Sequence, residues 1–161
     1  MSGGECGCSC GATRYRVAAP ALFRMYCHCT ICQEFTGAAH SDLSVFAAAA
    51  VTLPPAAAVS FGRYRPPPAI NRGKCRACGA PSVEVMDLPL LPKLVFVPTA
   101  NLAPAQQLAP SAHFFYNRRL QAAADGLPKY GGYWPSQLAF GRLYLQALRR
   151  RKSVGASSTQ S

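Results

Sequence analysis

The spacing of the cysteines constrains this chain more than any other feature of its sequence. Among its 161 residues are eight cysteines, all in three short groups. The groups are Cys6, Cys8 and Cys10; Cys27, Cys29 and Cys32; and Cys75 and Cys78. Cys-x-Cys and Cys-x-x-Cys spacings bring sulfur atoms close enough to share one metal ion, which for zinc lies about 2.3 Å from each sulfur. The sequence therefore predicts a fold organised around metal sites.

Disulfides are the main alternative use of these cysteines, because an even number suits a secreted protein with four bridges. Residues 1–20 contain no apolar run of the signal-peptide type. Cysteine makes up about 5% of the chain, below the 8–10% that is typical of disulfide scaffolds. The longest apolar stretch, 45–59, is interrupted by prolines and is too short to span a membrane. These observations favour a cytoplasmic metal-binding protein and leave disulfides as the alternative.

Two of the cysteine pairs have the form expected of zinc knuckles. The sequences CSCG and CRACG each place a glycine, Gly11 or Gly79, directly after the second cysteine. A knuckle turn needs a residue with positive φ and points backbone amides at the sulfurs. We expect the two knuckles to close one tetrahedral, structural zinc site from Cys8, Cys10, Cys75 and Cys78. Cys6 is an alternative to Cys8 in this site and is otherwise expected to be a free thiol.

The remaining segment, MYCHCTICQEF at 25–35, contains three cysteines and no obvious fourth ligand. We interpret Cys27, Cys29 and Cys32 as a second, open zinc site. His28 could supply a fourth ligand, but neighbouring residues rarely reach the same ion, so we expect a polar residue beside the cluster. His40 and His113 are the two remaining histidines of the chain, and each is more commonly an ordinary strand residue than a ligand.

Short alternating segments with Pro and Gly between them predict a mainly β protein with sandwich-like or folded sheets. One short helix is expected at 30–37, with Thr30 as its cap and Gly37 as its stop. The expected strands cover 12–19, 21–27, 40–46, 58–65, 69–74, 82–86, 93–97 and 112–117.

A basic amphipathic helix is expected at 132–152, with Pro135 and Ser136 marking its start. The residues expected to line one stripe of this helix are Leu138, Gly141, Leu145 and Leu148. The polar tail at 153–161 is expected to be disordered.

Five positive charges lie in the last twenty residues of the chain, whose formal net charge is +11. The residues concerned are Arg142, Arg149, Arg150, Arg151 and Lys152. A docked helix whose cationic end complements its own dipole is the simpler interpretation. Contact with a membrane surface, a nucleic acid or another subunit, including a homo-oligomer, is the alternative. Nucleic-acid binding is disfavoured because the basic residues have no clustered aromatic side chains among them.

The order of the motifs resembles a known family. GCSCGATRY, YCHCTICQEFTGA, RGKCRACGAP and AHFFYN…ADGLPKY follow one another as in the glutathione-dependent formaldehyde-activating enzyme family, which includes centromere protein V. The resemblance covers 3–131 and implies a β-tent fold, in which small antiparallel sheets are joined by zinc and here precede a C-terminal helix.

The resemblance also implies an activity. Members of this family join glutathione and formaldehyde into S-hydroxymethylglutathione, a carbon–sulfur lyase type of reaction. Cys27, Cys29 and Cys32 would then be the catalytic zinc site, with a substrate thiol as fourth ligand, and the other four cysteines would hold the structural zinc. Arginines near the site could bind the carboxylates of glutathione, and the candidates are Arg63, Arg65, Arg72 and Arg76. A non-catalytic binding module for a protein or an anionic partner is the alternative function.

Overall fold

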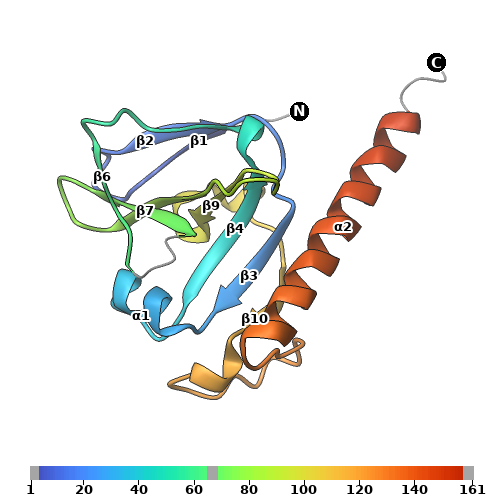
Figure 1. Cartoon of the computed structure of the whole chain (residues 1–161). Coiled ribbons are helices and arrows are strands. Elements are labelled where there is room, and N and C mark those ends of the chain that lie inside the picture. The colour runs from blue at the N-terminus through green and yellow to red at the C-terminus, as the bar shows by residue number, and fades with distance from the viewer. Residues whose placement is uncertain (1–3, 65–68, 158–161) are drawn as a thin grey trace.

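The computed structural model describes residues 4–64 and 69–157, which form a mainly β protein with two α-helices (Figure 1). The elements are β1 (Gly4–Gly7), β2 (Arg14–Val17), β3 (Phe23–Cys27), α1 (Thr30–Thr36), β4 (Ser41–Ala47), β5 (Val51–Thr52), β6 (Val59–Gly62), β7 (Ile70–Cys75), β8 (Pro81–Met86), β9 (Leu94–Pro98), β10 (Pro110–Phe114) and α2 (Tyr133–Ser157). Four short 3₁₀ turns lie at Ala48–Ala50, Thr99–Asn101, Pro104–Gln106 and Tyr116–Arg118.

The strands form a three-stranded sheet, β1-β2-β5, and a seven-stranded sheet, β10-β3-β4-β9-β8-β7-β6. The expected mainly β architecture with a C-terminal helix is confirmed. The larger sheet is mixed rather than wholly antiparallel, because β10 pairs with β3 in parallel. Strands β1 and β5 are not among the expected ones, since each is short and neither alternates clearly between polar and apolar residues.

The short helix α1 follows β3 after only two residues. Gly37 ends it with a φ of 67°, as expected. The cap is Cys29 rather than Thr30, because the Cys29 sulfur accepts a hydrogen bond from the Cys32 backbone N–H at 3.3 Å. One of the clustered cysteines therefore also fixes the start of the helix.

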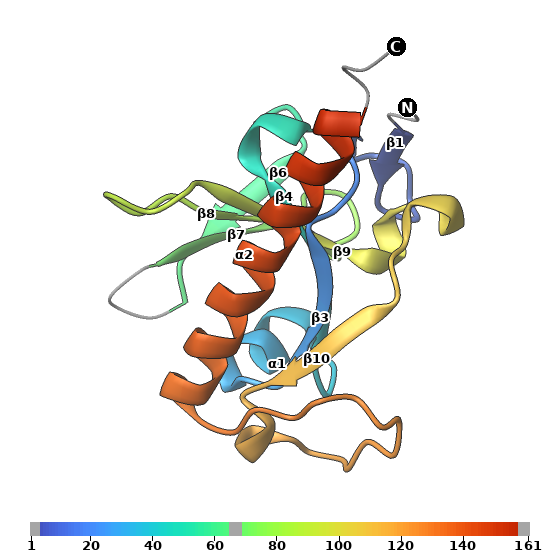
Figure 2. The ribbon, with the colours of Figure 1, turned by 90° about the vertical axis from the view of Figure 1, so that its right-hand side faces the viewer.

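Helix α2 lies beside β3 and crosses in front of the larger sheet (Figure 2). Of the four residues on the expected stripe, Leu138 is 68% exposed and Leu145 54% exposed, whereas Gly141 and Leu148 are partly buried. The buried side of the helix contains Ala139 and Ala147, and the partly buried Phe140 packs edge-on against Phe23 at 5.2 Å between ring centroids. Small alanines let the helix approach the sheet, so the larger leucines are not the ones that face it.

The ends of α2 also differ from the expectation. The helix continues to Ser157, so the first part of the expected disordered tail is helical, and 158–161 lie outside the described residues. Near its C-terminus, Arg150 and Arg151 donate hydrogen bonds to the carbonyls of Leu22 and Pro20. Part of the basic end therefore binds the segment before β3. Within the described residues, neither helix has the length and apolar character that crossing a bilayer requires.

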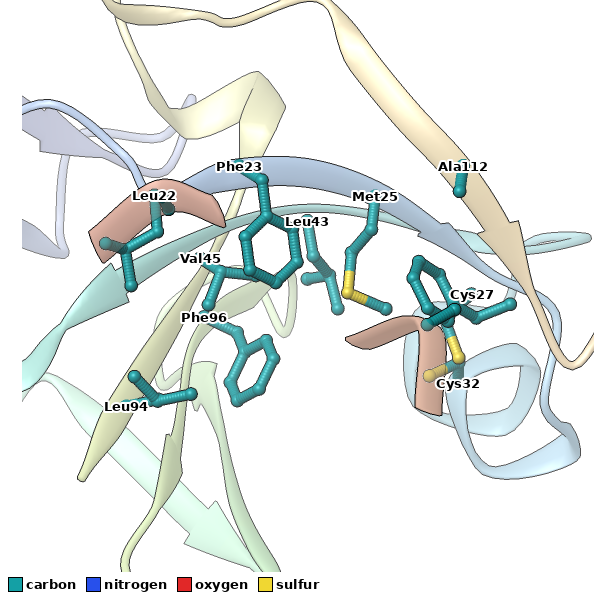
Figure 3. Packing of buried hydrophobic residues seen from close by; sticks show 13 residues of the cluster. Leu22, Phe23, Met25, Cys27, Cys32, Leu43, Val45, Leu94, Phe96 and Ala112 are labelled. Atoms are coloured by element: carbon teal, nitrogen blue, oxygen red, sulfur yellow. The ribbon is translucent and has the colours of Figure 1, made fainter. Parts of the chain in front are cut away.

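The larger hydrophobic cluster includes residues of the seven-stranded sheet and of α2. Figure 3 shows it extending from Leu22 past Phe23 and Phe96 to Met25, with Cys27 and Cys32 at one end. The apolar core thus continues directly up to the second cysteine group.

Candidate metal centres and the adjoining cavity

The first cysteine group joins two distant parts of the chain. Cys8 and Cys10 lie in the connection between β1 and β2, Cys75 ends β7, and Cys78 lies in the turn before β8. The four sulfur atoms all lie within 4.8 Å of one another. Cys8 Sγ is 3.0 Å from Cys10 Sγ and 3.4 Å from Cys75 Sγ. The structure thus brings together the two knuckles that the sequence predicts to pair.

The backbone of each knuckle has the predicted shape. Gly11 and Gly79 have φ values of 77° and 73°, in the left-handed region. Their amides donate hydrogen bonds to the carbonyls of Cys8 and Cys75, at 2.9 and 2.8 Å. Each turn thereby returns its second cysteine toward its first.

The second cysteine group lies between a strand end and a helix start. Cys27 ends β3, Cys29 caps α1, and Cys32 lies in the first turn of α1. The three sulfurs converge within 4.8 Å, and no His, Asp or Glu of the described residues joins them as a fourth ligand atom. Cys27 and Cys32 are buried, whereas Cys29 is partly exposed.

Both groups have the donor chemistry that zinc prefers, and all eight cysteines have free sulfurs, so no disulfide competes. Bonds of about 2.3 Å to a tetrahedral zinc place sulfurs about 3.8 Å apart. In the first group, Cys10 Sγ lies 3.7 Å and Cys8 Sγ 3.4 Å from Cys75 Sγ, whereas Cys8 Sγ and Cys10 Sγ are closer, at 3.0 Å. Both groups could therefore hold a metal ion.

Within the second group the thiolate form is favoured at Cys29, whereas the pKa values of the Cys27 and Cys32 thiols are raised. Hydrogen bonds from Cys27 and then Cys32 lower the pKa of the Cys29 thiol, and the charge of Arg72 lowers it further. Arg72 is buried and lies 2.8 Å from the carboxylate of Glu84. Burial raises the pKa of Glu84 to about 7, although Arg72 opposes this effect. A buried ion pair therefore lies beside the three sulfurs.

A buried polar network holds the residue between Cys27 and Cys29. His28 Nε2 lies 2.8 Å from His113 Nδ1, and His113 Nε2 lies 2.6 Å from Asp125 Oδ2. An ionised Asp125 accepts a hydrogen bond from His113 Nε2, and a second hydrogen bond joins the two histidine rings. Burial is the largest cause that lowers the pKa of His28, to about 4, which keeps its ring neutral.

The histidines therefore do more than the sequence suggested. None of them closes the second group, in agreement with the preferred interpretation of His28, but all three meet: the His40 ring centroid lies 5.0 Å from that of His28. His113 belongs to β10, and β10 and β3 are neighbours only because of the parallel pairing. Asp125 lies in the motif ADGLPKY, but no spacing rule assigns a role to a single acid in a loop. Cys6 is buried in the smaller hydrophobic cluster, outside both cysteine groups.

A cavity of about 740 Å³ opens beside the second group and includes all three of its cysteines in the lining. One wall comes from the strands of the larger sheet and the opposite wall from α2. Most lining side chains are apolar, and Arg72, Glu84 and Arg118 are the charged ones among the described residues. The three cysteines thus adjoin a space that is large enough for a small-molecule ligand.

The arginines expected near this site are mostly elsewhere. Arg72 lines the cavity, but its charge is paired with Glu84. Arg76 lines a separate hollow beside Cys75, Arg63 is exposed after β6, and Arg65 lies outside the described residues. The exposed Arg118, which the sequence did not point to, contributes to the cavity from the 3₁₀ turn after β10.

Comparison with known proteins identifies the family of this chain. The sequence model of a family described as glutathione-dependent formaldehyde-activating enzyme matches residues 4–118. The chain belongs to this family. The matched range includes both cysteine groups, whereas α2 and Asp125 of the polar network lie beyond it. No curated protein matches the chain significantly.

Among solved structures, a crystal structure of a Rhodobacter sphaeroides protein has a similar fold. The two chains are 18% identical, the alignment covers 66% of this chain and 98% of the other, and the TM-score is 0.50. Membership of the glutathione-dependent formaldehyde-activating family thus rests on the sequence match, and the structural likeness supports the fold.

Proposed function

We propose that this chain is a zinc-dependent enzyme of the carbon–sulfur lyase type, which forms or cleaves a thiol adduct in the cytoplasm. The formation of S-hydroxymethylglutathione from glutathione and formaldehyde is the simplest such reaction. One observation carries the proposal: Cys27, Cys29 and Cys32 converge without a fourth ligand from the described residues and line a cavity of about 740 Å³. A purely structural site has no need of such access.

The residues of the chain would divide the work as follows. Cys27, Cys29 and Cys32 would hold a zinc ion, which would supply a Lewis acid that lowers the pKa of an arriving thiol. The charge of Arg72 offsets the negative charge of the sulfurs. The network from His28 to Asp125 fixes the peptide segment between Cys27 and Cys29.

The reaction itself balances without a further reactant. The thiol loses its proton, and its sulfur attacks the carbonyl carbon, so that a carbon–sulfur bond forms. The π pair of the carbonyl moves to oxygen, which takes up a proton. The protein would accelerate this step by holding the thiolate beside the aldehyde, and Arg118 at the cavity would attract a carboxylate of glutathione.

The four-cysteine group would hold the second, structural zinc. We therefore expect two zinc ions per purified chain by elemental analysis. One zinc ion, or none with disulfides formed, would contradict the proposed division into two sites.

The decisive test of activity is exchange NMR on glutathione and formaldehyde with the zinc-loaded protein. We expect faster exchange between free and hydroxymethylated glutathione than in protein-free buffer. A catalytically silent binding module is the second candidate, because Trp134, Leu138 and Leu145 expose apolar surface on α2. Unchanged exchange in the presence of a two-zinc protein would favour that candidate.

A further inference from the structure

The cavity beside the three cysteines is much more apolar than glutathione and formaldehyde require. Its apolar lining comes from the strands and from the loop after β8, in addition to α2. These side chains include Ile70, Met86, Leu88, Leu91, Leu94 and Phe96. Formaldehyde adds a single carbon and oxygen to the thiol, so this lining would have little to contact.

The charges of the cavity also do not match those of glutathione. Glutathione carries two carboxylates and one ammonium group. Arg72 is already paired with Glu84, which leaves Arg118 as the unpaired charged side chain among the described lining residues. Charged groups without partners are costly to bury, so the charged part of a glutathione adduct belongs at the exposed Arg118 rather than among the apolar side chains.

Helix α2 supplies one wall of this apolar space. The lining residues Tyr133, Gln137, Phe140, Gly141 and Tyr144 follow helical spacing and form one face. Phe140 is held by edge contact with Phe23 and lies 6.0 Å from Phe96 between ring centroids. Because α2 lies outside the range 4–118 that matches the family, this wall is a feature beyond the shared part of the chain.

We propose that the substrate is the thiol adduct of an apolar aldehyde, aliphatic or aromatic, whose hydrocarbon group occupies the cavity between α2 and the larger sheet. This inference rests on the proposed function and names its substrate class. The reaction is R–CHO + R′–SH → R–CH(OH)–S–R′: a carbon–sulfur bond forms, and the thiol proton is replaced by one on the new hydroxyl oxygen. The reacting carbon lies at the three cysteines and the group R extends away from them. Hydrocarbon burial then favours longer aldehydes by up to about fourfold per methylene, equivalent to about 0.8 kcal/mol.

Gly141 allows the cavity to be filled without disturbing the fold. It lies in α2, it lines the cavity, and a Cβ added there meets no atom within 4 Å. Gly141→Leu therefore adds a side chain at the wall, in a helix where leucine is favoured over glycine. Gly155→Leu is the matched control, since Gly155 lies on the same helix away from the cavity lining and its added Cβ also meets no atom within 4 Å.

The test combines binding and exchange on the zinc-loaded full chain. Calorimetry compares S-hexylglutathione with S-methylglutathione, and NMR compares the exchange of glutathione with hexanal and with formaldehyde. We expect S-hexylglutathione to bind at least about tenfold more tightly, from several buried methylenes, and hexanal to be the preferred aldehyde. Gly141→Leu should lower both preferences at least about fivefold, while Gly155→Leu should retain them. Circular dichroism verifies that both variants are folded.

The outcomes separate this inference from the proposed function. Accelerated formaldehyde exchange without a preference for hexanal or S-hexylglutathione overturns the apolar substrate and leaves the proposed function standing. Equal losses in Gly141→Leu and Gly155→Leu also overturn it, because the cavity would not be the cause. Tight binding of S-hexylglutathione without acceleration of either aldehyde overturns the enzyme function, and the substrate assignment with it.

Discussion

The two cysteine groups both offer sulfur as the ligand atom, but they differ in their place in the fold. The four-cysteine group joins the β1–β2 connection to the β7–β8 turn, and its four sulfurs could complete the coordination of a tetrahedral ion. The three-cysteine group comes from one segment of six residues and adjoins a cavity. The first therefore links parts of the fold, whereas the second, as proposed, would leave a coordination position open toward a ligand. Ligand count and chain separation, rather than ligand type, distinguish a structural from a reactive site.

Removing a ligand from the four-cysteine group is the most severe way to test this difference. Cys75→Ser should lose one zinc ion and leave the domain largely unfolded, because the apparent free energy of structural zinc binding, about 10–16 kcal/mol, is comparable to a domain's whole stability. Thermal unfolding followed by circular dichroism, with elemental analysis, measures both effects. A folded Cys75→Ser chain with an unchanged melting temperature would show that this group does not hold the fold together.

Removing a ligand from the three-cysteine group should act on activity instead. Cys29→Ser should lose one zinc ion, and its exchange rate should be at least about a hundredfold lower. Its free energy of unfolding should fall by only about 1–2 kcal/mol. Cys6→Ser is the matched control, since Cys6 is buried but lies in neither group. It should retain both zinc ions. If Cys29→Ser unfolds the protein as completely as Cys75→Ser, the second group is structural too.

Both groups could be predicted because each is built from Cys-x-Cys or Cys-x-x-Cys spacings, which are visible within a few residues of sequence. Two knuckles with Gly11 and Gly79 indicate their own turns, and one family match fixes the order of the motifs. The polar network could not be predicted, because it joins His28 to His113 across a parallel strand pair and then to Asp125 in a loop. No short-range pattern encodes such a contact.

The buried face of α2 differs from the predicted stripe for a different reason. Leu138 and Leu145 follow helical spacing as well as the residues of the buried face do. A rule based on hydrophobicity therefore selects these larger, more apolar side chains as the buried ones. The sheet instead receives Ala139 and Ala147, whose small side chains permit close packing. Consequently the wall of the cavity, and with it the substrate class, could be inferred only from the three-dimensional arrangement.

The smallest expected effect concerns the network that supports the three-cysteine group alone. His113 is buried, and His113→Ala would remove the hydrogen-bond partner of both His28 and Asp125. The loss should cost about 1–3 kcal/mol of unfolding free energy and accelerate zinc release from this group several-fold, measured with a chromogenic chelator. Asn101→Ala is the matched control: Asn101 donates to the carbonyls of Pro81 and Ser82, on β8. Asn101→Ala should lower the free energy of unfolding by a similar amount without accelerating zinc release from the three-cysteine group. Equal release rates in the two variants would mean that the network stabilises the fold generally and does not position the Cys27–Cys29 segment.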